Sequence, residues 1–140
     1  MAKFRNKALA ALLAAAGGGL GLHRFYLGLR AAWLPPLLLA AGAGLALRSD
    51  PWYQSPGFFV AALPVVVGFV EAIVLALTGD ERFDARYNPG AERHNRSGWG
   101  AVLVAVGTMI VGSIIALTAI VLLVQTIVEK RQAAGIDQRP

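Results

Sequence analysis

Cysteine is absent from this chain of 140 residues, and its absence excludes several kinds of chemistry. Without a thiol there is no disulfide, no thiol redox couple, no thiolate metal site and no cysteine nucleophile. Histidine is scarce: the 2 in the sequence cannot form a metal site without help from acids. No HExxH spacing and no serine in a GxSxG context occurs in the sequence. We therefore predict that the protein is not an enzyme and uses no metal and no cofactor.

Charge is also scarce, and hydrophobic residues take its place. Charged side chains make up 15% of the chain and hydrophobic ones 56%, whereas soluble domains average roughly 25% charged residues. The apolar residues gather in four runs, at 8–22, 31–47, 57–79 and 99–128. The last run holds no charge in 30 residues, and a helix needs only about 20 to cross the hydrocarbon core. These runs predict an all-α integral membrane protein.

The formal net charge of +5 fits the same class of protein. The basic residues flank the apolar runs, where they orient helices and meet anionic headgroups. We therefore expect the lipid bilayer, and no nucleic acid, to be the partner of these side chains.

The first apolar run follows Lys3, Arg5 and Lys7, which is the layout of a signal peptide. Because the apolar character continues past the candidate cleavage site, we expect no cleavage, although the alternative stays open. A helix over 8–22 reaches only about 22 Å, which is short of the roughly 30 Å core. The segment either makes a short span or enters partway and returns. The three glycines at 17–19 weaken the helix or let another backbone approach closely.

The second and third runs are expected to form a two-helix hairpin. Pro35 and Pro36 favour a helix start, because proline is tolerated in the first turn. The stretch RSDPWYQSPG at 48–57 has the composition of a loop. Its Trp52 and Tyr53 are candidate anchors at the water–lipid interface, where amphipathic rings concentrate.

The polar stretch at 80–98 separates the third run from the fourth. Its first part, 80–88, is expected to form an interfacial helical turn with Phe83 and Tyr87 on one side. This part contains three acids, Asp80, Glu81 and Asp84, with basic residues between them. We interpret them as a charged turn exposed to solvent.

The fourth run carries small residues at spacings of three and four, which places them on one helical face. We favour packing within the chain for this face over homodimerisation. From Glu129 onward the sequence is polar and is expected to fray. The face consists of Ala101, Ala105, Thr108, Gly112 and Ala116.

Glu71 is the one acid in the third run. Acids inside membrane segments are costly and usually face a partner in the bundle. The expected partner is Arg24 or His23, if the turn after the first run dips into the bundle. We favour a structural pair over a proton or ion relay, because no second intramembrane carboxylate continues a relay.

The block GGGLGLHRFYLG at 17–28 resembles the signature of the TM-two domain family, which is named for its pair of transmembrane helices. Members also carry an acid in the later helix, matched here by Glu71. DERFDARYN at 80–88 resembles the Asp-x-x-Phe-Asp-x-x-Tyr-Asn ending of proteobacterial members. The resemblance implies a membrane fold, with no particular activity. The signature residues are Gly21, His23, Arg24, Phe25, Tyr26 and Gly28.

The resemblance covers residues 3–88. A polar linker at 89–98, an additional transmembrane helix at 99–128 and a polar tail at 129–140 are expected to follow. The additional helix lies outside the family domain, whereas Pro35, Pro36 and the loop at 48–57 are local departures from the family pattern within it.

Charge also predicts the orientation, because basic residues prefer the cytoplasmic side. If 8–22 enters partway and returns, then the N-terminus, the HRFYLG turn and the 80–98 loop all lie in the cytoplasm. That arrangement places the most basic residues inside and the C-terminus in the periplasm. We therefore predict a multi-pass protein of a bacterial inner membrane.

The function expected from these features is that of a non-enzymatic accessory subunit. It would pack against other membrane-protein subunits or against a second copy of itself. Two alternatives stay open. One is a small transport or channel component that uses Glu71. The other is a module that binds anionic lipid, with Arg24, Phe25 and Tyr26 at the membrane surface.

Overall fold

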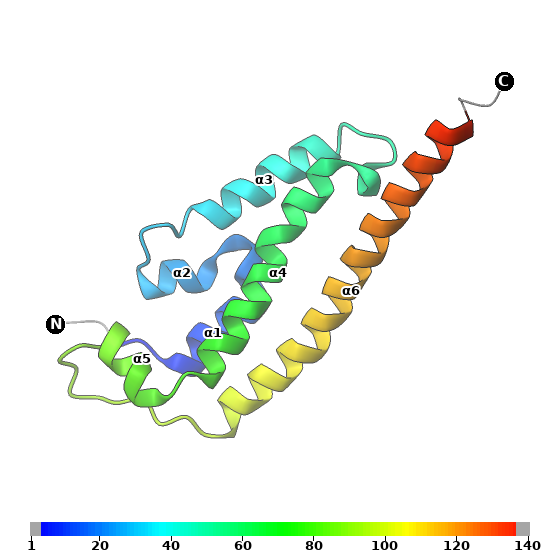
Figure 1. Cartoon of the computed structure of the whole chain (residues 1–140). Helices are drawn as coiled ribbons and strands as arrows, with labels where there is room; N and C mark the ends of the chain where they lie inside the picture. The colour runs from blue at the N-terminus through cyan, green and yellow to red at the C-terminus, as the bar shows by residue number, and fades with distance from the viewer. Residues whose placement is uncertain (1–3, 137–140) are drawn as a thin grey trace.

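The computed structural model describes residues 4–136, and within this range every regular element is a helix. Two helices are long and apolar enough to cross a membrane: α4 (Pro56–Leu77) and α6 (Trp99–Ile136), each with a mean hydropathy of 2.5 over its most apolar window. Figure 1 shows α4 in the middle, with the N-terminal helices on one side and α6 on the other.

The N-terminal segment forms a helical hairpin that enters and returns. It consists of α1 (Lys7–Gly17), a 3-10 turn, η1 (Gly18–Leu20), and α2 (Leu22–Leu27). The start of α1 lies at the C-terminal end of α4, where Lys7 Nζ donates to the Thr78 carbonyl at 2.7 Å. The end of α2 comes back to the same place, since the Asn6 backbone N–H donates to the Tyr26 hydroxyl at 2.8 Å. The segment 8–22 and the helix after it therefore fold back on themselves, which is the shape expected of a segment that enters partway and returns.

Glycines permit the closest approach in this hairpin. A Cβ built on Gly18 would lie 2.4 Å from the Gly68 Cα of α4, a distance that no real side chain tolerates. The glycine run at 17–19 therefore lets the backbone of another helix approach closely.

The expected hairpin consists of α3 (Leu34–Ala46) and α4. Pro35 and Pro36 lie in the first turn of α3, as predicted. Ser55 caps α4 by accepting a hydrogen bond from the Phe58 N–H at 3.2 Å. The connecting loop contains a short 3-10 turn, η2 (Trp52–Gln54).

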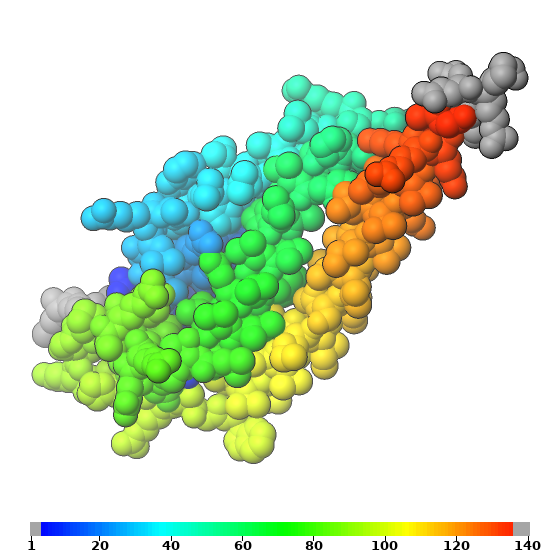
Figure 2. Space-filling view, in the orientation of Figure 1, coloured from blue at the N-terminus to red at the C-terminus, as the bar shows by residue number. Residues whose placement is uncertain are grey.

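The small-residue face of α6 packs within the chain. Ala101, Ala105 and Thr108 are buried, and Gly112 faces the Phe69 side chain of α4, where an added Cβ would meet the Phe69 Cβ at 3.1 Å. Ala116 is half-buried on the same side. Figure 2 shows α6 lying along α4 and continuing past it at its C-terminal end.

The outer surface of the long helices remains apolar. Only 6% of the most apolar window of α6 and 22% of that of α4 are buried. A core helix of a soluble protein would be mostly covered, so these exposed apolar surfaces belong in lipid. The protein is an all-α membrane protein.

The prediction that the chain frays from Glu129 is wrong, because α6 continues to Ile136. Residues such as Lys130, Arg131 and Ala133 are good helix formers, so the change to polar composition ends the apolar run without ending the helix. Gln54 Nε2 donates to Glu129 Oε2 at 2.6 Å, which ties this end of α6 to the α3–α4 loop. The rest of the predicted tail, 137–140, lies outside the described residues.

Candidate functional site

The signature helix α2 is framed by two glycines with left-handed backbone. Gly21 has a φ of 65° and Gly28 a φ of 73°, a region that side chains with a Cβ disfavour. At the end of α2 the Leu29 N–H donates to the Arg24 carbonyl at 2.9 Å and the Gly28 N–H donates to the Phe25 carbonyl at 3.1 Å. These two bonds are the Schellman pattern of a helix stop. The two glycines of GLHRFYLG therefore mark the start and the end of one short helix.

That short helix directs His23 and Arg24 at Glu71 of α4. His23 Nε2 lies 2.6 Å from Glu71 Oε2. Arg24 Nε donates to the same oxygen at 3.2 Å, and Arg24 Nη2 donates to Oε1. The pairing expected of Glu71 with Arg24 or His23 is thus found with both residues at once. We call His23, Arg24 and Glu71 the Glu71 cluster.

The Glu71 cluster is partly covered by the protein, most completely at His23. His23 is 2% exposed, and the side chains of Arg24 and Glu71 are 18% and 31% exposed. A guanidinium that engages both carboxylate oxygens makes a strong, directional pair. Both oxygens of Glu71 are therefore occupied by the re-entrant hairpin, and the pair fastens α2 to the membrane helix α4.

The remaining signature residues lie at the surface of the hairpin. Phe25 is 56% exposed and points outward. Tyr26 is half-buried; its hydroxyl accepts from Asn6, and its carbonyl accepts from Arg5 Nε at 3.3 Å. Of the three residues considered for a surface anchor, Arg24 therefore points inward, Tyr26 holds the N-terminal segment, and Phe25 faces out.

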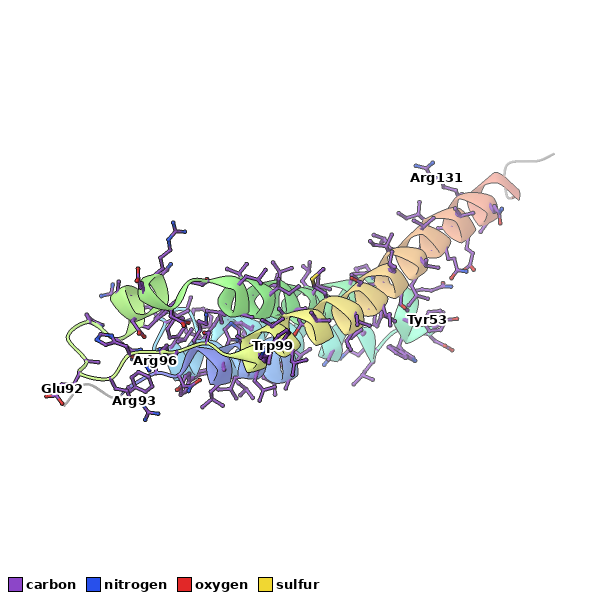
Figure 3. All side chains as sticks on the ribbon, turned by 90° about the horizontal axis from the view of Figure 1, so that it is seen from below. Tyr53, Glu92, Arg93, Arg96, Trp99 and Arg131 are labelled. Atoms are coloured by element: carbon purple, nitrogen blue, oxygen red, sulfur yellow. The ribbon has the colours of Figure 1, made fainter. Side chains whose placement is uncertain are left out.

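Trp52 and Tyr53 lie at the opposite end of the molecule from this hairpin terminus. Both rings are exposed and stack edge to face, with centroids 5.9 Å apart. Figure 3 shows Tyr53 on the same half of the molecule as Arg131, far from Arg93 and Arg96. The placement of Trp52 and Tyr53 is suited to anchoring that end of the molecule at the water–lipid interface.

A network of polar residues joins the N-terminal segment, α5 (Asp80–Tyr87) and the following loop. The sequence did not indicate this network. Asp84 is 7% exposed, so the interpretation of the acids as a solvated turn is wrong for this residue. Asn88 Nδ2 donates to Asp84 Oδ1 at 2.8 Å, and the Asn95 N–H donates to Asp84 Oδ2 at 2.7 Å. Burial alone would raise the pKa of Asp84, but the hydrogen bonds from Asn88 and Asn95 outweigh it and lower the pKa.

The same two asparagines bind the N-terminal segment. The Arg5 N–H donates to Asn88 Oδ1 at 2.8 Å, and Asn88 Nδ2 donates back to the Arg5 carbonyl at 2.9 Å. The Lys7 N–H donates to Asn95 Oδ1 at 2.9 Å. The polar linker predicted at 89–98 is therefore fixed in place, because buried Asn95 anchors it to the N-terminal segment.

Asp80 completes this network, which we call the polar cap. Lys7 Nζ lies 2.7 Å from Asp80 Oδ1, and the Ser97 N–H donates to Oδ2 at 2.6 Å. Burial would raise the pKa of Asp80, but the hydrogen bonds from Lys7 and Ser97 lower it to about 2. The polar cap consists of Arg5, Lys7, Asp80, Asp84, Asn88, Asn95 and Ser97.

Part of the polar cap has a sequence signal. Asp84 and Asn88 stand four residues apart, the spacing of neighbours on a helix. Phe83, predicted at the interface, is fully buried and packs on Tyr87 with ring centroids 4.8 Å apart. Asn88 and Asn95 both bind the backbone of Arg5, which lies 83 and 90 residues away from them in the sequence. No local sequence pattern indicates pairs so far apart.

The apolar surface, the two helices of membrane-spanning length and the Glu71 cluster together define a small α-helical membrane protein. The uncharacterized membrane protein YozV of Bacillus subtilis is 33% identical to the chain over 88 residues, which cover 63% of the chain and 87% of that relative. The chain therefore belongs to the same family as this Bacillus subtilis protein. No family model matches the chain, and a search of solved structures finds no significant match.

Proposed function

We propose that the protein is a non-enzymatic accessory subunit of a membrane assembly, built on a TM-two-like domain at 3–88 with α6 added to it. The proposal rests on one observation: α6 buries one face within the chain and leaves its other apolar faces exposed. Its small-residue face is occupied by α4 and α1, whereas residues such as Leu103, Ile110 and Leu117 on its other faces are 67%, 59% and 62% exposed. This leaves a long apolar surface for lipid and for helices of other subunits.

The Glu71 cluster supports a structural role in place of catalysis or transport. Both oxygens of the carboxylate are engaged by His23 and Arg24, so the acid holds the hairpin to α4. A transport component would need a path past this carboxylate, and it is the alternative against which the proposal is tested.

We further propose that the polar cap faces the cytoplasm of a bacterial cell and the α3–α4 loop faces the periplasm. Basic residues crowd at the cap end, in the N-terminal segment, α5 and the following loop. The opposite end carries Arg48, Lys130 and Arg131. This asymmetry follows the preference of basic residues for the cytoplasmic side.

The proposal is tested by purifying the chain from native membranes after photo-crosslinking. A photoreactive residue at Leu117 probes the free surface of α6, and one at Leu37, 53% exposed on α3, serves as the matched control. We expect a discrete adduct from Leu117, and co-purification of the same larger protein in stoichiometric amount. A symmetric homo-oligomer with Glu71 lining a wet path would support the transport alternative. Purification of a monomer with lipid adducts alone would contradict both.

A further inference from the structure

A second polar site lies beside the polar cap, at the start of α6. The loop after α5 and the N-terminal segment enclose a hollow of about 320 Å³. We call it the basic hollow, and its lining includes Phe4, Arg93, His94, Arg96, Ser97 and Gly100. No acid lines it.

The two arginines of the basic hollow are free to bind an anion. Among residues 4–136, neither Arg93 nor Arg96 makes an ion pair. Arg93 is positioned by Phe4, since its guanidinium carbon lies 4.9 Å from the centre of that ring. The two guanidinium groups therefore bring positive charge to the hollow that no ion pair within residues 4–136 neutralises.

The two carboxylates nearest the basic hollow, Asp80 and Asp84, contact lining residues of the hollow but form no ion pair with Arg93 or Arg96. Asp80 is paired with Lys7 and accepts from Ser97. Asp84 is buried under Asn88 and Asn95, although it lies 3.7 Å from His94 Nδ1. Figure 3 shows Glu92 at the outer end of the loop, pointing away from the molecule.

The basic hollow lies at the polar end of the apolar helix α6. It opens where α6 leaves the polar loop, beside Trp99, which is 81% exposed. Tryptophan at the end of an apolar helix marks the water–lipid interface, and Figure 3 places Trp99 next to the loop that carries Arg96. Arginine recognises phosphate through paired N–H donors.

We propose that the basic hollow binds the phosphate group of an anionic phospholipid, with Arg93 and Arg96 as the residues that hold it. This goes beyond the accessory role and uses none of the residues of the HRFYLG turn. It assigns a ligand class to the loop at 89–98, which the family domain does not include.

The test measures lipid binding to the full chain in detergent by native mass spectrometry. The probes are phosphatidylglycerol, dioleoylglycerol, which lacks phosphate, and inorganic phosphate. The test variant is Arg93→Gln/Arg96→Gln. The matched control, Arg82→Gln/Arg86→Gln, removes two exposed charges from α5 at the same end of the molecule.

We expect the test variant to bind phosphatidylglycerol about tenfold or more weakly, since each arginine supplies charged hydrogen bonds. The control variant should change by less than about twofold, and dioleoylglycerol should bind all three proteins equally. Equal weakening by both double variants, or none by the test variant, would overturn the proposal. Inorganic phosphate that binds with the same arginine dependence would support the phosphate site and assign a soluble source to its ligand.

A second variant keeps the result interpretable if the glutamine pair impairs folding. Arg93→Lys/Arg96→Lys retains the charge and loses the planar fork that matches phosphate. It should keep the melting temperature of the wild type and bind phosphatidylglycerol with an affinity between those of the wild type and the glutamine pair. Wild-type affinity in the lysine pair together with wild-type affinity in the glutamine pair would overturn the proposal.

Discussion

The guanidinium of Arg24 engages both carboxylate oxygens of Glu71 and so fastens the short signature helix to α4. Arg24 therefore points into the bundle and not out toward lipid phosphate. The block GLHRFYLG forms the return turn of the N-terminal hairpin: Gly21 and Gly28 set the ends of α2, and its arginine and histidine fix α2 in place. Removal of one member of such a pair leaves an uncompensated charge in a poorly hydrated place.

Glu71→Ala is expected to lower the stability and the membrane accumulation of the protein more than Glu71→Gln. Both variants leave the Arg24 charge without a counter-charge, which for alanine should cost about 3 kcal/mol, but glutamine keeps an oxygen that accepts a hydrogen bond from Arg24 and so should lose less. The measurements are the protein level in membranes and the melting temperature in detergent. Glu81→Ala, at an exposed acid of α5, is the control and should behave as wild type.

A double variant separates the charge pair from a general packing effect. Arg24→Ala/Glu71→Ala removes both charges, so its loss should be smaller than the sum of the two single losses. Additive losses, or wild-type levels of Glu71→Ala and Glu71→Gln alike, would contradict the pairing.

Gly42→Ala is expected to destabilise the α3–α4 hairpin, whereas Gly44→Ala two residues away should not. A Cβ on Gly42 would lie 2.5 Å from the Ala61 nitrogen and 2.7 Å from the Gly57 carbonyl oxygen, while one on Gly44 meets nothing within 4 Å. The backbone atoms cannot give way, so overpacking should cost about 1–3 kcal/mol. Melting temperatures of the two purified variants make the comparison, and equal values would show that the helices separate easily.

The sequence predicted the features that depend on local patterns. The apolar run at 57–79 closely matches α4, and the proline pair marks the first turn of α3, because lipid-facing composition and proline stereochemistry act within a few residues. The partner of Glu71 was also predictable, since a buried acid needs a cation and few lie close to the membrane segments.

Features that depend on distant pairs were not predictable from one sequence. Asp84 and Asn95 look like ordinary loop residues, and only the fold brings the Arg5 backbone between Asn88 and Asn95. The end of α6 was missed for a different reason. Hydropathy reports where lipid ends, whereas helix propensity carries the helix on through Glu129 to Ile136.

Acid is expected to weaken the fold through the polar cap. The pKa of Asp80 is lowered from 3.8 to about 2 in the folded protein, so its contribution is fully present above pH 3.8 and is lost as the pH falls toward 2. The melting temperature in detergent should therefore fall across this window, and it should fall less in Asp80→Asn, which no longer titrates. A variant curve parallel to that of the wild type would show that Asp80 does not contribute.

The orientation of the molecule is open to a labelling experiment for which the chain is well suited, because it contains no cysteine. Single cysteines at Phe4, Glu92 and Ser49 report the N-terminal segment, the loop after α5 and the loop between α3 and α4. Because Arg93 stacks on Phe4, the first two should react with an impermeant maleimide from the same side, the cytoplasmic one, and Ser49→Cys only from the periplasm. Labelling of Phe4→Cys and Glu92→Cys from opposite sides would contradict the re-entrant hairpin. Labelling of both from the periplasm would keep the hairpin and reverse the orientation, which would mean that the basic residues of the polar cap end do not determine how the protein inserts.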